Sequence, residues 1–192
     1  MAEEKRKRLV GLATAGVLGA ALVAALVAVA LAGGGSDGTA SPDEPFGTHY
    51  EGLEERRLAA GVPVMSDASQ GEHIHPELAV YVNGEQMEVA ANIGIDPSRP
   101  PEQMAGLHTH DTSGTIHVEN AADPTLGQFF QIWGVPFSET QLGPHQSEGA
   151  ATVRIWVDGK PSTAFGDLKL EDGQEIVVAY GEPSEMPSDF GS

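Results

Sequence analysis

After residue 72 the chain mostly alternates hydrophobic and polar positions, which is the pattern of half-buried β-strands. The stretch 73–95 contains two such runs around Asn83-Gly84, a dipeptide that tolerates the positive φ angles of a tight hairpin turn. The stretch 107–120 predicts a second hairpin, and 151–180 predicts three strands joined by Asp-Gly turns. We therefore expect most of the domain to be β-sheet.

Two segments have a helical pattern instead. In the stretch from Thr125 to Gly134, hydrophobic residues recur at the spacing of one helix face, Gln128 can form a capping box with Thr125, and Gly134 ends the helix. A second short helix is predicted within 50–61. The apolar stripe of the first helix, which we expect in the core, consists of Leu126, Phe129, Phe130 and Trp133.

These elements predict a small, mainly β domain of the α+β class, in which strands surround one compact aromatic helix. A β-grasp-like arrangement and a sandwich-like arrangement both fit the order of the predicted elements.

The beginning of the chain predicts a membrane anchor. Residues 1–8 include the basic run KRKR, and residues 9–32 carry no charge. A spanning helix needs about 20 apolar residues, whereas the hydrophobic part of a signal peptide has roughly 7–15. Length therefore favours a retained signal anchor, although Ala30-Leu31-Ala32 also fits a cleavage site.

The positive-inside rule predicts that residues 1–8 are cytoplasmic and that the chain after the 9–32 transmembrane helix is extracytoplasmic. We thus expect a single-pass protein of the cell membrane. Residues 33–48, rich in Gly, Ser, Pro and Asp, predict a flexible linker. A histidine-rich domain is expected over 49–181, followed by a disordered tail over 182–192.

Charge and cysteine content exclude several kinds of function. The chain has 28 acidic and 10 basic residues, for a formal net charge of -18. Such a surface repels phosphate backbones and attracts cations, so nucleic acid is excluded as a partner. The alternative interpretation of this acidity is that it only keeps an exported domain soluble. The absence of cysteine excludes disulfides, thiolate metal sites and cysteine nucleophiles.

Five of the seven histidines fall into two His-x-His units and one nearby position. A period of two places both rings of each unit on one side of a strand. In the 107–120 hairpin, cross-strand neighbours have Cβ atoms about 4.5–5.5 Å apart, a spacing that one metal ion can bridge. The expected ligands are His108, His110 and His117 first, then His73 and His75, which need tertiary pairing to reach the same place.

Asp111 and Glu119 lie beside these histidines and can complete a ligand set or orient the ring N–H groups. Imidazole ligands suit Zn or Cu, which are the expected cofactors. A metal-binding module is therefore the first hypothesis. A metal-dependent enzyme, using activated water or copper redox chemistry, and a non-metal interaction domain or pH sensor remain the alternatives. No HExxH or GxSxG motif identifies a catalytic residue, and no motif identifies a protein partner.

Five segments in a fixed order resemble an uncharacterised family of exported or membrane-anchored bacterial and archaeal proteins. They are HIHPELAVYVNG, NIGI, LHTHDTSGTIHVE, TLGQFFQIWGV and DGQEIVVAYG, and together they cover about residues 70–181. The most specific piece is HTHDTSGTIHVE. The resemblance implies that the exported domain is a recurring unit with the histidine-bearing hairpin at its centre, and it implies no particular activity.

Overall fold

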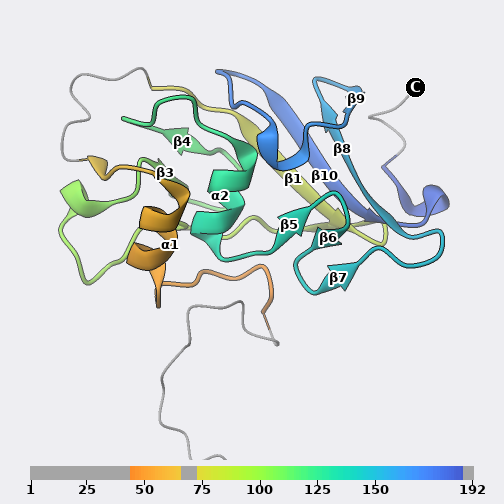
Figure 1. The fold of residues 1–192 in the computed structure, drawn as a ribbon, viewed down its shortest axis with the longest axis horizontal. Coiled ribbons are helices and arrows are strands. Elements are labelled where there is room, and N and C mark those ends of the chain that lie inside the picture. The colour runs from red at the N-terminus through yellow and green to blue at the C-terminus, as the bar shows by residue number, and fades with distance from the viewer. Residues whose placement is uncertain (1–43, 66–72, 188–192) are drawn as a thin grey trace, which may run out of the picture. The chain divides into compact units, whose positions relative to one another are not determined.

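The computed structural model describes residues 44–65 and 73–187, whose central feature is a five-stranded mixed sheet (Figure 1). Its strands lie in the order β2-β1-β10-β8-β9. The central strands β1 and β10 are parallel, and every other pair is antiparallel. The strands are β1 (Glu77–Val82), β2 (Glu85–Met87), β8 (Thr152–Val157), β9 (Lys160–Ser162) and β10 (Glu175–Gly181).

The two faces of this sheet bury different amounts of hydrophobic surface. Alternate residues of β1, β10 and β8, such as Val80, Val178 and Ile155, are fully buried and belong to the main core together with the helices. The opposite face carries a small separate cluster around Trp156 and Val177. The main core therefore lies between the sheet and the helices, as the period-two pattern requires.

The helix α2 (Leu126–Trp133) confirms the predicted start, stop and buried face. The backbone N–H of Gln128 donates to Thr125 Oγ1 (3.3 Å), and the N–H of Thr125 donates to Gln128 Oε1 (2.9 Å), which completes the capping box. Gly134 ends the helix with a left-handed φ of 83°. Each residue of the predicted apolar stripe is at most 1% exposed: Leu126, Phe129, Phe130 and Trp133.

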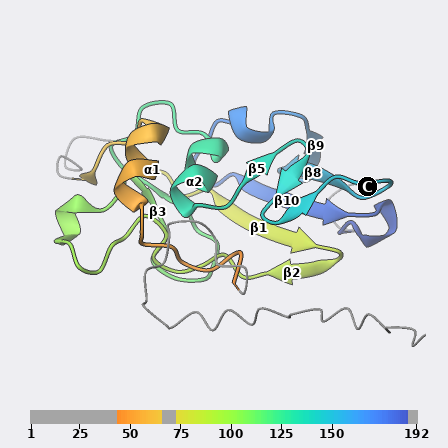
Figure 2. The ribbon, with the colours of Figure 1, turned by 60° about the horizontal axis from the view of Figure 1, so that its bottom comes forward.

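The predicted helix within 50–61 is also present as α1 (Leu53–Ala60) and ends at Gly61. Figures 1 and 2 agree that α1 and α2 lie side by side. Arg56 ties them together, because its Nε–H donates to the carbonyl of Ile132 at 3.1 Å.

Several short elements complete the domain. The histidine hairpin is formed by β3 (Leu107–His108) and β4 (His117–Val118). A three-stranded sheet of β5 (Phe137–Ser138), β6 (Gln141–Leu142) and β7 (His145–Gln146) was not predicted, because two-residue strands are too short to show a period. Short 3₁₀ turns in the described part of the chain span Pro101–Gln103, Phe165–Asp167 and Pro183–Glu185.

The domain is thus strand-rich and of the α+β class, as the sequence predicts. Parallel central strands, each flanked by an antiparallel neighbour, with helices packed on one face match the β-grasp-like alternative. In the described part of the chain, no second large sheet packs on the first, which is what a sandwich requires.

The structure describes parts of the predicted linker and tail. Within the linker predicted over 33–48, Phe46 is only 6% exposed and its ring centroid lies 6.0 Å from that of Trp133. Within the tail predicted over 182–192, a 3₁₀ turn follows β10 and Met186 packs on the cluster around Trp156. Phe46 and Met186 are isolated apolar residues in polar surroundings, so no period in the sequence marks them.

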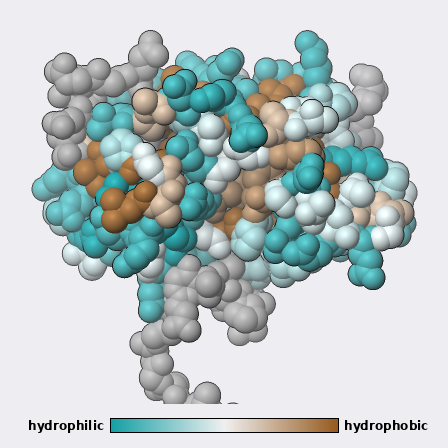
Figure 3. Space-filling view, viewed as in Figure 1, coloured by the Kyte–Doolittle hydropathy of each residue, from teal (hydrophilic) through white to brown (hydrophobic). Residues whose placement is uncertain are grey.

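The predicted transmembrane helix, residues 9–32, lies outside the described residues. Within the described ranges, neither helix is long and apolar enough to span a bilayer. Hydrophilic residues cover most of the domain face shown in Figure 3, with hydrophobic residues gathered across its middle and near α1. Leu58 of α1 is the most exposed large hydrophobic residue described, at 62%.

Candidate metal centre

The hairpin of β3 and β4 is held against the start of β1. Its strands pair Leu107 with Val118 and His108 with His117, so the two histidines are direct cross-strand neighbours. The carbonyl of Gly114, in the connecting loop, accepts the backbone N–H of Leu78 at 2.9 Å. Gly114 has a φ of 90°, and a Cβ added there would lie 2.2 Å from the carbonyl oxygen of Leu78. Glycine is therefore required for the hairpin loop to approach β1 this closely.

Thr109 fixes the backbone between His108 and His110. Its buried hydroxyl donates to the carbonyl of Ala90 (2.8 Å) and accepts the N–H of Ile93 (3.1 Å). Because Thr109 is anchored on one side of the extended chain, its two neighbours point to the other side. Their ring centroids are 4.8 Å apart, as the His-x-His pattern predicts.

The rings of His108, His110 and His117 converge on one point. One nitrogen from each ring lies within 4.8 Å of the other two. The closest pair is His108 Nε2 and His110 Nε2, at 3.2 Å. A tetrahedral ion with bonds of about 2.0–2.1 Å to nitrogen separates its ligand atoms by roughly 3.3–3.4 Å. The Nε2 atoms of His108 and His110 therefore already have about the spacing of two ligands of one ion.

His108 is held in the form that a metal ligand needs. Its side chain is fully buried, and Nδ1 lies 2.9 Å from the carbonyl oxygen of Ala105. A carbonyl only accepts, so Nδ1 carries the proton and Nε2 presents its lone pair toward His110. A backbone carbonyl on the second ring nitrogen is a common partner of metal-bound histidine, because it fixes both tautomer and ring orientation.

Electrostatics also keep these rings neutral. Burial, which is the largest cause, and the neighbouring histidines together lower the pKa of His108 to about 4, against the opposing hydrogen bond to Ala105. Burial and the rings of His110 and His75 lower the pKa of His117, while Glu119 and Asp111 act in the opposite direction. At neutral pH both rings are therefore uncharged, which is the state that binds a metal ion.

In metal-free protein, His108 is expected to make stability fall as the pH drops from about 6.5 to about 4. Its pKa is about 4 in the fold and near 6.5 in the unfolded chain, so the unfolded chain takes up a proton first. The contribution is complete above pH 6.5 and is lost through this window. The loss between pH 7 and pH 4.5 amounts to about 2–3 kcal/mol, to be measured by urea unfolding in chelator at these two pH values.

The variant His108→Gln tests that assignment. It keeps a polar side chain without a titrating ring, so its stability should change less between the two pH values. Carboxylates with lowered pKa, such as Glu54 and Asp96, are common to both proteins and cancel in the comparison. An equally steep pH dependence in the variant would show that His108 is not responsible.

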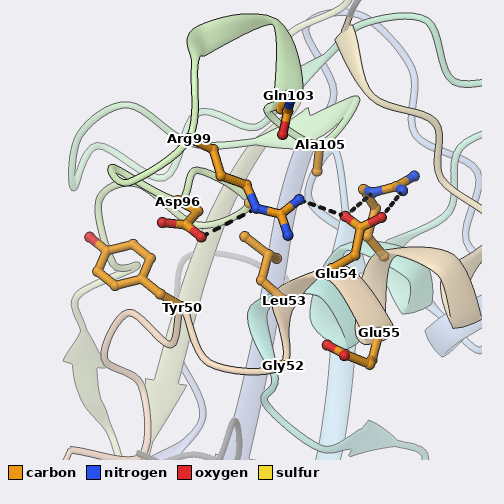
Figure 4. A pocket seen from close by; sticks show the side chains of 11 residues that line it. Tyr50, Gly52, Leu53, Glu54, Glu55, Asp96, Arg99, Gln103 and Ala105 are labelled. Atoms are coloured by element: carbon orange, nitrogen blue, oxygen red, sulfur yellow. Dashed lines mark hydrogen bonds and ion pairs between the residues drawn. The ribbon is translucent and has the colours of Figure 1, made fainter.

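An ion pair connects α1 to the segment that precedes Ala105. Arg99 Nη1 lies 3.2 Å from Glu54 Oε2, and Arg99 Nε lies 3.6 Å from Asp96 Oδ2 (Figure 4). These side chains and Ala105 line a small cavity of about 260 Å³. The ion pairs are partly exposed, so each contributes little to stability, but together they restrain the segment that orients His108.

The two histidines of the second His-x-His unit, His73 and His75, lie in different surroundings. Ile74 forms an isolated bridge with Val118, which places His75 beside the hairpin. The ring centroids of His75 and His117 lie 4.9 Å apart, edge to face. His73 is exposed and lines a different, open depression together with Ile74 and Asn120. Tertiary pairing thus brings His75 to the side of the hairpin, whereas His73 lies elsewhere.

The two predicted carboxylates have different surroundings. Asp111 is exposed, and its Oδ1 accepts the backbone N–H of Ser113 at 2.9 Å, which shapes the turn. Ser113 also lowers the pKa of Asp111 through these hydrogen bonds. Glu119 follows β4, and its Oε2 is buried without a hydrogen-bond partner among the described residues. Glu119 is therefore the carboxylate that still needs a partner.

Two features of the site were missed from the sequence. The carbonyl of Ala105 carries no side-chain signal at all. Asp172 was predicted only as a turn residue, yet its Oδ1 accepts the backbone N–H of His75 at 2.9 Å. No local pattern predicts this contact, because the whole sheet is needed to bring Asp172 next to His75.

No family model, curated protein or solved structure matches the chain. The family resemblance of the five motifs remains a prediction, and the function must be inferred from the geometry of the histidines.

Proposed function

We propose that this domain is a metal-binding module that holds one divalent transition ion, Zn or Cu, between His108, His110 and His117. The observation that carries the proposal is the 3.2 Å approach of His108 Nε2 to His110 Nε2 while the Nδ1 of His108 is bound to a carbonyl. In the metal-free protein, the lone pair on His108 Nε2 can accept the Nε2–H of a neutral His110, and a cation bound between the two nitrogens takes the place of that proton. Because burial holds the pKa of His108 at about 4, its ring does not have to lose a proton before it binds a cation at neutral pH.

The donor set selects the class of metal. All three ligand atoms are imidazole nitrogens, which suit Zn and Cu, whereas Ca²⁺ and Mg²⁺ prefer oxygen. His110 is exposed and His117 is half-buried, so the ion is reachable from solvent. The excess of acidic residues raises the concentration of cations near the surface. These features support reversible binding, as in buffering or delivery of a metal.

The proposed location is the outer side of the cell membrane, with residues 9–32 as the anchor. The basic run before an uncharged segment of this length supports that orientation. Fractionation of cells that express the full chain tests it. A mature protein that begins at Gly33 and is released into the medium would contradict the anchor.

A metal-dependent enzyme is the second candidate, and Glu119 is the observation that favours it. Three histidine ligands leave one position of a tetrahedral ion open to water. A buried carboxylate oxygen without a partner can accept a proton from such a water. Binding of a small anion to the metal-loaded protein distinguishes an open fourth position from a closed one.

Metal analysis tests the main proposal. The chain from residue 33 onward, purified without a histidine tag and stripped with chelator, is expected to take up one Zn²⁺ or Cu²⁺ ion in titration calorimetry. The variant His145→Ala is the matched control, because His145 lies outside the cluster and its ring stacks on Tyr180 at 5.0 Å. A wild-type protein that binds neither ion would remove the proposal.

A further inference from the structure

We infer that His75 is the fourth ligand of the bound ion and that Asp172 positions it, so that a side chain from outside the hairpin closes the site. This inference rests on the proposed function, because it concerns the same ion.

His75 approaches the cluster from the segment that leads into β1. Its ring meets that of His117 edge to face at a centroid distance of 4.9 Å. The ring centroids of His110 and His117 are 4.7 Å apart, so His75 is about as near to His117 as an expected ligand is. The side chain of His75 is 45% exposed and can change its rotamer. Such a rotation is needed, because among the described residues only the three hairpin histidines bring ligand nitrogens within 4.8 Å of one another.

Asp172 holds the backbone of His75 and lies close to its ring. Its Oδ1 accepts the backbone N–H of His75 at 2.9 Å and lies 3.8 Å from the ring Nδ1. A small rotation of the ring lets Nδ1–H donate to the carboxylate, which leaves Nε2 free for a metal. This is the arrangement that the carbonyl of Ala105 imposes on His108. A carboxylate on the second ring nitrogen also makes the imidazole a stronger donor.

The fold builds this contact. His75 precedes β1 and Asp172 precedes β10, and these strands are parallel neighbours with Glu77 opposite Glu175. The N–H of Glu77 donates to the carbonyl of Gln174 at 2.8 Å, which closes the space between the two approaching segments. Parallel pairing therefore brings both strand beginnings to the same end of the sheet, where the hairpin also packs. The contact between His75 and Asp172 is therefore set by the pairing of β1 with β10.

Four imidazole ligands would satisfy a tetrahedral ion and leave no position for water. The site would then hold and exchange its ion and would not activate water. His73 provides the matched comparison, because it belongs to the same His-x-His unit and is exposed but lines a different depression.

Cobalt substitution tests the inference on the full-length chain, solubilised in detergent and without a histidine tag. Co²⁺ reports coordination through its visible absorption. The wild type and His73→Ala should show a four-coordinate spectrum that excess azide leaves unchanged. In His75→Ala, water should enter the fourth position, azide should shift the spectrum, and added imidazole should restore the wild-type spectrum.

Asp172→Asn tests positioning separately. The amide oxygen can still accept the backbone N–H of His75, so the metal-free protein should unfold at the wild-type temperature. Loss of the charged partner should weaken Co²⁺ binding about tenfold or more. Unchanged Co²⁺ affinity in this variant would overturn the role of Asp172.

The remaining outcomes separate the two proposals. If His75→Ala keeps the azide-insensitive wild-type spectrum, His75 is not a ligand, and the three-histidine site still stands. If azide already shifts the wild-type spectrum, the fourth position is open, and the inference is overturned in favour of the enzyme. If the wild type binds no Co²⁺, Zn²⁺ or Cu²⁺, the proposed function falls, and the inference falls with it.

Discussion

Replacing His117 by alanine is expected to abolish tight metal binding and the thermal stabilisation that comes with it. His117 faces His108 across the hairpin, and its ring centroid lies 4.7 Å from that of His110 and 4.9 Å from that of His75, so its loss removes a ligand that is close to all the others. An ion present at a hundred times its dissociation constant stabilises the wild type by about 2.7 kcal/mol. For a domain of this size that corresponds to a rise in Tm of roughly 5–10 °C, measurable by calorimetry with and without Zn²⁺.

The control for this experiment is His73→Ala, which should keep the full metal-dependent rise in Tm. Chelator should lower the Tm of the metal-loaded wild type to that of His117→Ala. The metal hypothesis is contradicted if chelator leaves the wild type unchanged while His110→Ala and His117→Ala both bind Zn²⁺ like the wild type. The hairpin would then be a polar edge that is rich in histidine.

Replacing Phe130 by alanine is expected to cost about 3–5 kcal/mol of the free energy of unfolding. Phe130 is 1% exposed, and its ring stacks on that of Phe137 with centroids 4.3 Å apart. Its ring also lies 5.5 Å from that of Trp133, so truncation leaves a cavity lined by aromatic rings. Urea unfolding measures the loss as a shift of the midpoint.

Leu58→Ala is the matched control for Phe130→Ala. Leu58 also lies on a helix and is a large hydrophobic residue, but it is 62% exposed. Its truncation should change the free energy of unfolding by about 0.5 kcal/mol or less. A wild-type midpoint for Phe130→Ala would show that the aromatic stripe of α2 is not part of the core.

Local patterns predicted the parts of this domain that depend on near neighbours. The capping box of Thr125 and Gln128 requires only residues three positions apart, so α2 could be predicted with its first and last turns. The proximity of His108, His110 and His117 could also be predicted, because a single hairpin with a period of two brings them together.

Long-range contacts set the limit of that approach. His73 and His75 are equivalent in sequence, and only the tertiary structure, including the bridge from Ile74 to Val118, places the ring of His75 beside that of His117. The contact between His75 and Asp172 depends on the pairing of β1 with β10. Phe46 is buried because its ring meets Trp133, a partner that no local pattern indicates.

The central position of β10 has a kinetic consequence. Residues 77–82 pair with residues 175–180, so the sheet closes only after nearly the whole domain has been synthesised. The hairpin that carries His108, His110 and His117 needs no such partner and is complete much earlier. On the proposed function, a metal ion would bind a chain that is still folding and would nucleate the hairpin against which β1 docks. The supply of metal would then set the rate at which this domain folds.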